Sequence, residues 1–248
     1  GATTISASGQ DITFEESAST FGSLLLTGAN VAVTDAGAVD LGASTVGGTL
    51  GITSAGAVTD SGTLAITGAT TISASGQDIT LDESASTFGT LALTGANVAV
   101  TDAGAVDLGA STVSGTLGIT SAGAVTDSGT LAVTGATTIS ASGQDITLDE
   151  SASTFGTLAL TGVNVAVTEN AATDLGASTV SGTLGITSAG AVTDSGTLAV
   201  TGATTISASG QDITLDDSAS TFGSLLLTGA NVAVTDAGAT DLGASTVG

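Results

Sequence analysis

Acidic and hydroxyl side chains are the only groups in this sequence that could take part in chemistry. The 248 residues include 23 Asp and Glu but no Lys, Arg, His, Cys or Tyr, so the formal net charge is −23. Without cationic side chains the protein cannot neutralise nucleic-acid phosphates or an anionic membrane surface. Catalysis would have to use carboxylates and hydroxyls alone. We therefore expect neither an enzyme nor a nucleic-acid partner. We also expect no membrane span, because no apolar run approaches ~18 residues.

Eleven of the acids recur at a regular place, each just after a short apolar stretch such as "VT" or "ITL". They are Glu15, Asp35, Asp60, Asp82, Asp102, Asp127, Asp149, Glu169, Asp194, Asp216 and Asp236. Their separations run 20, 25 and 22 residues and repeat in that order. This spacing predicts one column of carboxylates at a single corner of a coiled chain, with four further acids nearby: Asp40, Asp107, Asp174 and Asp241. Repeated carboxylate oxygens suit Ca²⁺, so the column is a candidate metal site.

Two other interpretations of these acids stay open. Strand-end acids would keep a Lys-free fibre soluble and stop its edges from pairing with other chains. The absence of an EF-hand spacing favours this interpretation over calcium. A catalytic pair such as Asp82 and Glu83 is disfavoured, because adjacent residues on a strand point to opposite faces. No cofactor is certain, and Ca²⁺ is the one candidate.

The positions of the acids follow from an internal repeat of 67 residues. The stretch "GATTISASGQDIT" begins at Gly1, Gly68, Gly135 and Gly202. A repeat of this kind is typical of solenoids and other stacked architectures. We expect one continuous β-solenoid over residues 1–248, built of repeats 1–67, 68–134 and 135–201 and a partial repeat 202–248.

Within a repeat, the apolar residues alternate in short runs and show no helical spacing. The first repeat contains nine strand-like units, at Ile5, Ile12–Phe14, Leu24–Leu26, Val31–Val33, Val39–Leu41, Val46, Leu50–Ile52, Val58 and Leu64–Ile66. Nine units divide into three rungs of three strands, with about 22 residues per rung. The sequence thus predicts an all-β, right-handed parallel β-helix of about eleven rungs stacked at ~4.8 Å. An array of β-sandwich domains is the alternative, although such domains need longer strands and larger core residues.

Recurring Asn and Phe residues have structural interpretations. The Asn residues precede a strand and are expected in solvent-facing turns: Asn30, Asn97, Asn164 and Asn231. Four Phe residues recur once per repeat and are expected to fill the core or a corner: Phe21, Phe88, Phe155 and Phe222. The chain has too few aromatic residues for a platform that stacks sugars or bases.

Several stretches resemble a known family. "GTLALTGANVAV", "GTLGITSAGAV" and "SGTLAVTGATTISASGQDITL" are similar to the degenerate repeats of filamentous-haemagglutinin-like bacterial exoproteins. Those are large secreted adhesins with a right-handed β-helix shaft, often exported by two-partner secretion. The resemblance covers the whole chain, but the family's amino-terminal secretion domain and a receptor-binding insertion are not seen. It implies shaft architecture and an extracellular or cell-surface location, and it carries over no adhesive site.

We expect a structural role, as the rigid shaft or filament of an extracellular bacterial surface or matrix fibre. The expected partner is another copy of the chain, through head-to-tail or lateral contacts, because the sequence opens on a strand motif and stops within a repeat. The alternative is an adhesin or a ligand- or Ca²⁺-binding segment of a large secreted exoprotein. The one cluster of non-isosteric changes, "TENAATD" in place of "TDAGAVD" at residues 168–174, is too mild for a binding site and favours structure.

Overall fold

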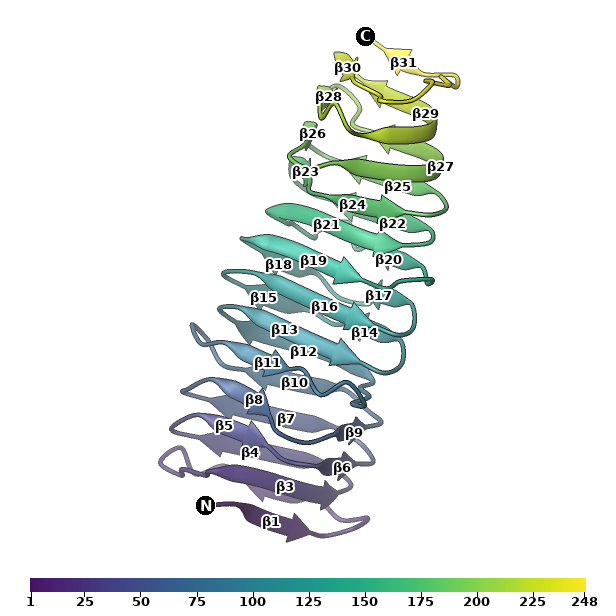
Figure 1. Cartoon of the computed structure of the whole chain (residues 1–248). Coiled ribbons are helices and arrows are strands. Elements are labelled where there is room, and N and C mark those ends of the chain that lie inside the picture. The colour runs from purple at the N-terminus through teal and green to yellow at the C-terminus, as the bar shows by residue number, and fades with distance from the viewer.

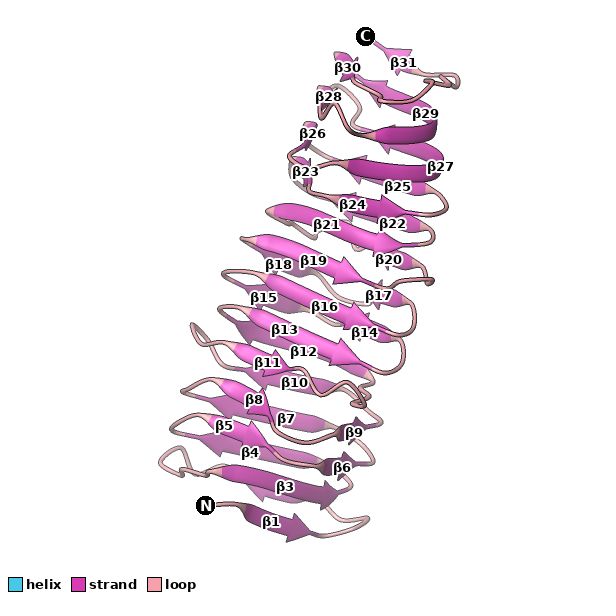
Figure 2. Ribbon diagram, viewed as in Figure 1, coloured by secondary structure: helices cyan, strands magenta, loops and turns pink.

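The computed structural model describes residues 1–248 as a rising coil of short strands joined by turns, with no helix (Figures 1 and 2). The two termini lie at opposite ends of an elongated column. The strands nearest the viewer run to the right as the chain climbs, so the coil is right-handed (Figure 1). Strands of successive turns pair in parallel, which excludes the β-sandwich alternative. No helix that could cross a membrane occurs in the chain.

Two ladders of parallel strands form the broad sides of the column. The first ladder contains β1 (Thr3–Ser6), β3 (Ser23–Gly28), β5 (Val39–Leu41), β8 (Val58–Asp60), β11 (Ile79–Leu81), β13 (Val98–Asp102), β16 (Leu117–Ser121), β19 (Ala136–Ser140), β21 (Thr157–Gly162), β23 (Thr173–Leu175), β26 (Val192–Asp194), β28 (Ile213–Leu215) and β30 (Val232–Val234). The second ladder contains β2 (Ile12–Phe14), β4 (Val31–Asp35), β7 (Leu50–Ser54), β10 (Thr70–Ser73), β12 (Thr90–Gly95), β14 (Val106–Leu108), β17 (Val125–Asp127), β20 (Ile146–Leu148), β22 (Val165–Glu169), β25 (Leu184–Ser188), β27 (Leu198–Ser207) and β29 (Thr221–Gly229).

Short third strands lie between the two ladders and alternate between the edges of the column. We call the edge where the chain passes from the first ladder to the second the first edge, and the opposite one the second edge. The first edge carries β6 (Ser44–Val46), β9 (Leu64–Ile66) and β24 (Ser178–Val180). The second edge carries β15 (Ser111–Val113), β18 (Leu131–Val133) and β31 (Thr246–Val247).

This alternation arises because one 67-residue repeat makes three and a half turns. Ile12 and Ile146 lie two repeats apart, both in the second ladder, and seven strand-to-strand steps separate them. Ile79, one repeat after Ile12, lies in the first ladder. The right-handed parallel solenoid is confirmed, whereas the expected three rungs per repeat become three and a half. About eleven rungs become about 13 turns of roughly 19–22 residues.

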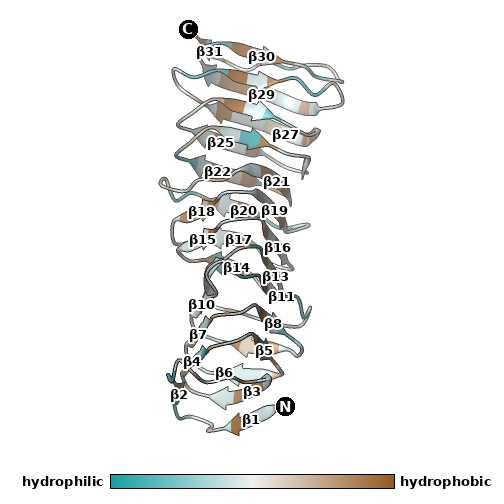
Figure 3. Ribbon diagram, turned by 90° about the vertical axis from the view of Figure 1, so that its left-hand side faces the viewer, coloured by the Kyte–Doolittle hydropathy of each residue, from teal (hydrophilic) through white to brown (hydrophobic).

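The alternation of side chains along each strand fills a single apolar core. In β4, Val31 and Val33 point inward, while Ala32 and Thr34 between them are partly exposed. Figure 3 shows the same alternation of apolar and polar residues in other strands. The buried apolar side chains form one cluster of 53 residues that runs along the column. Phe88 and two of its equivalents belong to this cluster and Phe21 packs against it, as expected.

Hydroxyl groups inside the column fall into two sets. Ser111 is buried and accepts a hydrogen bond from the Leu93 N–H at 3.0 Å, while its own hydroxyl donates to the Gly109 carbonyl at 2.8 Å. Ser111 represents the first set, whose hydroxyl groups are hydrogen-bonded. The second set consists of three fully buried Thr residues whose Oγ1 atoms have no hydrogen-bond partner: Thr70, Thr137 and Thr204. The first set ties neighbouring turns together, whereas the second leaves polar atoms unsatisfied inside the core.

Candidate functional site

The eleven predicted acids lie at both edges of the column and not at one corner. The first edge carries Asp60, Asp82 and Asp102, then Asp194, Asp216 and Asp236. The second edge carries Glu15 and Asp35, then Asp127, Asp149 and Glu169. The prediction of a single column is wrong, because a repeat of three and a half turns moves each group of three to the opposite edge. Their surroundings divide most of these acids into three kinds.

The first kind closes a five-residue strand and is buried: Asp35, Asp102 and Glu169, each 2% exposed. In Asp102, Oδ1 accepts from the Gly104 N–H at 2.6 Å and Oδ2 accepts from the Phe88 N–H at 3.1 Å. Glu169 accepts from the Phe155 N–H at 2.8 Å, and its Oε2 has no partner. Burial raises the pKa of Asp102 and of Glu169 above its ordinary value, and the hydrogen bonds oppose this rise.

The second kind closes a three-residue strand and binds the loop of the following turn: Asp60, Asp127 and Asp194. Oδ1 of Asp60 accepts from the Asp82 N–H at 2.9 Å, and Oδ1 of Asp127 accepts from the Asp149 N–H at 2.8 Å. Burial again raises the pKa of Asp60 and of Asp127 above its ordinary value, and the hydrogen bonds from these N–H groups oppose it. Both kinds therefore stabilise turns of the main chain.

The third kind is exposed and follows a strand: Glu15, Asp82, Asp149 and Asp216. Asp236 is half-buried and accepts from the Gly238 N–H at 2.8 Å.

Nowhere do three or more acids come together in a way that could hold a metal ion. Calcium binding by these acids stays a prediction from the sequence. Asp82 and Glu83, the pair weighed for catalysis, both donate their N–H groups to the Asp60 carboxylate.

The sequence predicts four further acids beside the column. Asp40, Asp107 and Asp174 point outward from the middle of a strand, and Asp241 is exposed. Oδ2 of Asp107 accepts from the hydroxyls of Thr90 and Ser128, at 2.8 Å each. Those hydroxyls lie in the turns below and above it, so this acid also links successive turns.

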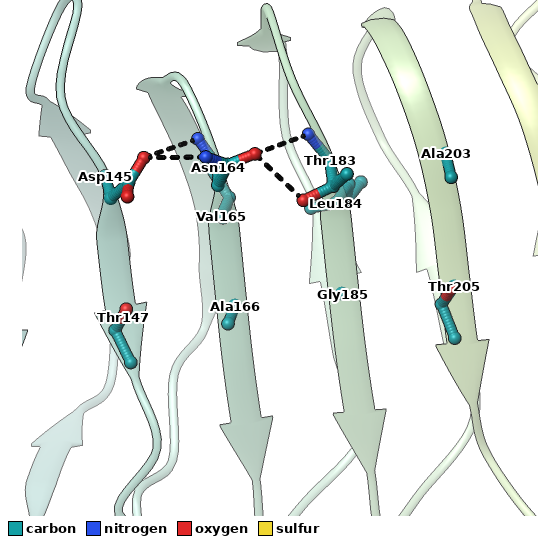
Figure 4. A pocket seen from close by; sticks show the side chains of 10 residues that line it. All are labelled: Asp145, Thr147, Asn164, Val165, Ala166, Thr183, Leu184, Gly185, Ala203 and Thr205. Carbon is teal, nitrogen blue, oxygen red and sulfur yellow. Dashed lines mark hydrogen bonds between the residues drawn. The ribbon is translucent and has the colours of Figure 1, made fainter.

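A separate row of polar side chains runs along the outer surface. Oδ1 of Asp145 accepts from the main-chain N–H of Asn164 at 3.0 Å and from its side-chain Nδ2 at 3.0 Å. Oδ1 of Asn164 then accepts from the N–H and the hydroxyl of Thr183 in the next turn, at 3.1 and 3.0 Å (Figure 4). Asn164 and its three equivalents are exposed, which confirms the expected solvent-facing position.

A shallow hollow of about 370 Å³ lies beside this row on the outer face of the second ladder (Figure 4). Ala166 and Gly185 form its floor, Thr147 and Thr205 lie at its two ends, and the row from Asp145 to Thr183 lines one side. A second hollow, of about 230 Å³, lies over Gly51, the equivalent of Gly185 two repeats earlier. Sequence reasoning missed both hollows, because their residues come from four successive turns.

The comparisons with known proteins agree with the period of the repeat. Three successive stretches, residues 28–94, 95–161 and 162–228, match DUF5649, a family of repeats of unknown function. Each stretch begins where a long strand ends, at Gly28, Gly95 or Gly162. No curated protein and no solved structure matches the chain. The tandem 67-residue repeat is thereby confirmed, although the match is not to filamentous-haemagglutinin-like proteins. Because the three matched stretches cover most of its length, the chain belongs to the DUF5649 repeat family.

Proposed function

We propose that this chain is a non-catalytic structural protein that forms the rigid shaft or filament of an extracellular fibre at a bacterial surface or in its matrix. The observation that carries the proposal is the uninterrupted pairing of about 13 turns around one apolar core. Each turn is joined to the next by main-chain hydrogen bonds on both broad sides, and such stacking makes a solenoid stiff along its axis.

The changes in the third repeat favour a structural role over an adhesive one. Glu169 replaces the Asp of the other repeats, yet it keeps the buried place of Asp102 and accepts from the Phe155 N–H as Asp102 accepts from that of Phe88. The most divergent stretch of the chain therefore preserves the same strand closure. A copy specialised for a receptor would instead present a changed outer surface.

The extracellular location draws its support from the resemblance to filamentous-haemagglutinin-like exoproteins and from the acidic surface. A charge of −23 with no Lys or Arg keeps long strand-rich particles apart in solution. Association of shafts end to end, or side by side once salt screens their charge, is part of the same proposal.

Deletion of one complete repeat tests the shaft directly. Removing residues 68–134 joins two nearly identical junctions, so we expect a folded solenoid that is shorter by three and a half turns, or about 17 Å. Small-angle X-ray scattering measures the maximum dimension, and circular dichroism checks the strand content. A deletion of residues 68–123, which breaks the repeat, is the matched control. Unchanged length after the complete deletion would contradict the proposal.

Antibody labelling of the source organism tests the location. Intact cells should bind an antibody against the chain as strongly as permeabilised cells do. Binding that requires permeabilisation would contradict an extracellular shaft even if the rod itself is confirmed.

A further inference from the structure

Three glycines in the middle of strands have no local structural reason to be glycine. They are Gly51 in β7, Gly118 in β16 and Gly185 in β25. A Cβ added at any of them would meet only one carbonyl oxygen, at 3.8 Å, and none has a positive φ. By contrast, Gly143 has a φ of +81°, and a Cβ on Gly135 would clash with the Gly115 carbonyl oxygen.

A glycine inside a strand weakens the strand, and it often marks a place where another group comes close to the backbone. Both hollows found on the surface of this molecule lie over such a glycine, Gly185 in one and Gly51 in the other. The two positions are separated by two repeats, or seven turns, on the outer face of the same ladder. At about 4.8 Å per turn, the hollows are about 34 Å apart along the column.

The shape and the polar groups of the hollow define what could occupy it. Its floor over Ala166 and Gly185 is bare backbone and one methyl group, which suits a flat group. At its side, Oδ1 of the exposed Asp145 accepts from Asn164, and no group of the chain donates to Oδ2. A free carboxylate oxygen and the Thr147 and Thr205 hydroxyls at the ends of the floor are acceptors for an outside donor.

Charge selects a cation as that donor. The protein has 23 acids and no Lys, Arg or His, so it attracts positively charged partners from every side. Among cationic groups, the guanidinium is planar and can donate two parallel hydrogen bonds to a carboxylate, whereas an ammonium is a compact point charge. A planar cation fits the flat floor beside Asp145 better than a compact one does.

We propose that the hollows over Gly51 and Gly185 are docking sites for arginine side chains of a partner polypeptide. The guanidinium lies flat on the Ala–Gly floor and donates to the carboxylate at its side, which is Glu15 in the hollow over Gly51 and Asp145 in the hollow over Gly185. This inference concerns the outer surface, and it does not depend on the chain being an extracellular shaft.

A labelled synthetic peptide of alternating arginine and glycine is the probe, and fluorescence anisotropy at 150 mM NaCl measures its binding. Matched peptides carry lysine or the neutral planar residue citrulline in place of arginine. We expect the arginine peptide to bind at least tenfold more tightly than either matched peptide. Equal binding of the lysine peptide would reduce the interaction to general attraction between opposite charges and overturn the proposal.

A double variant, Gly51→Val with Gly185→Val, fills both hollows with side chains that suit a strand. It should weaken binding of the arginine peptide at least tenfold, while Ala132→Val, an outward-facing control on β18, should change it less than twofold. The double variant Glu15→Gln with Asp145→Asn removes the carboxylates without adding volume, and should also weaken binding at least tenfold. Circular dichroism confirms that each variant is folded. Unchanged binding in both double variants, or equal binding of the citrulline peptide, would overturn the proposal.

Discussion

At the scale of single residues, the acids of this protein bind its own backbone. Asp102 and Asp60 each accept main-chain N–H groups from a neighbouring turn, and Asp107 accepts hydroxyl groups from two turns. No cationic side chain competes for these oxygens. The carboxylates consequently act as fixed acceptors at strand ends, and their ionised form is held in partly buried places where it is less stable than in water.

This burial predicts that the protein becomes less stable as pH rises, which is the opposite of the usual effect of carboxylates that are ion-paired in the folded state. The pKa values of Asp60, Asp102, Asp127 and Glu169 are raised in the folded protein. Raised carboxyl pKa values mean that the native state holds more protons than the unfolded state above about pH 4, so the free energy of unfolding falls as pH rises through the folded pKa values. The thermal midpoint, followed by circular dichroism, should be higher at pH 5 than at pH 7.

Glu169→Gln tests the cause of that pH dependence. The amide oxygen can still accept from the Phe155 N–H, but the group no longer ionises. We expect a smaller difference between the midpoints at pH 5 and pH 7 than in the original protein. The matched control, Asp149→Asn at an exposed position, should narrow the difference less. A midpoint that rises from pH 5 to pH 7 would contradict the explanation.

The buried threonines predict a stabilising substitution. Thr137 is fully buried and its hydroxyl has no partner, whereas its neighbour Thr138 is exposed. Thr137→Val replaces the hydroxyl by a methyl group of similar volume, and removes an unsatisfied buried group that costs about 1–3 kcal/mol. Urea unfolding should show a gain of about 1 kcal/mol, against less than about 0.5 kcal/mol for Thr138→Val. A loss of stability in Thr137→Val would show that the hydroxyl has a partner in solution.

At the scale of strands and turns, glycine has two distinct roles. Gly143 lies in the turn before β20 with a φ of +81°, in the left-handed region that side chains disfavour. Gly143→Ala should therefore lower the free energy of unfolding by about 1–2 kcal/mol. Gly118→Ala, inside β16, should leave it unchanged or raise it by up to about 1 kcal/mol, because alanine restricts the unfolded chain. Equal losses in the two variants would contradict this distinction.

The strands themselves could be predicted from the sequence, because alternation of apolar residues is a local signal. All nine units expected in the first repeat correspond to β1–β9. The number of turns could not be predicted, because it depends on which junctions bend. The chain runs straight through β3, whereas in the turn above it bends after Leu41 to give β5 and β6. Units of similar sequence thus form either one long strand or two short ones.

The positions of the acids at strand ends were predictable, but their burial was not. Asp35 and Asp60 both follow "VT", yet Asp35 closes a five-residue strand and is buried, while Asp60 closes a three-residue strand and is partly exposed. Strand length alone does not set this burial, because Asp127 also closes a three-residue strand and is only 8% exposed. The packing of each acid against the neighbouring turn decides it. The hollows depend in turn on side chains that four separate turns bring together.

At the scale of the whole molecule, each repeat ends half a turn out of phase with the one before it. Equivalent residues of successive repeats therefore lie on opposite sides of the column. The three successive acids Asp60, Asp82 and Asp102 lie at the first edge, and their equivalents one repeat later lie at the second. Charge is thereby spread around the column, where a whole number of turns would have stacked it on one corner. The same half-turn offset places the strand glycines Gly51, Gly118 and Gly185 on alternate broad faces.

Because the negative charges are spread over both edges of the column, we predict that dissolved cations stabilise the protein by screening the repulsion between carboxylates. Raising NaCl from about 10 to 150 mM shortens the range of repulsion between carboxylates to about 8 Å, so the thermal midpoint should rise. CaCl₂ at the same ionic strength should raise it by a similar amount. An additional shift of several degrees with Ca²⁺, reversed by a chelator, would establish the calcium site that the sequence predicts.

Sixty-seven residues make three and a half turns of a stiff column, and the separation of equivalent residues reports this directly. Asp82, Asp149 and Asp216 are exposed equivalents in successive repeats, and the chain has no Cys, so each can be replaced by a spin-labelled cysteine. Pulsed electron paramagnetic resonance on two doubly labelled proteins measures the separation of the labels. Labels at 82 and 216 share an edge and should give a narrow distribution near 34 Å, for seven turns of about 4.8 Å. Labels at 82 and 149 lie on opposite edges and should be well beyond the roughly 17 Å rise between them. A separation near 14 Å for that second pair, as three whole turns require, would contradict the account.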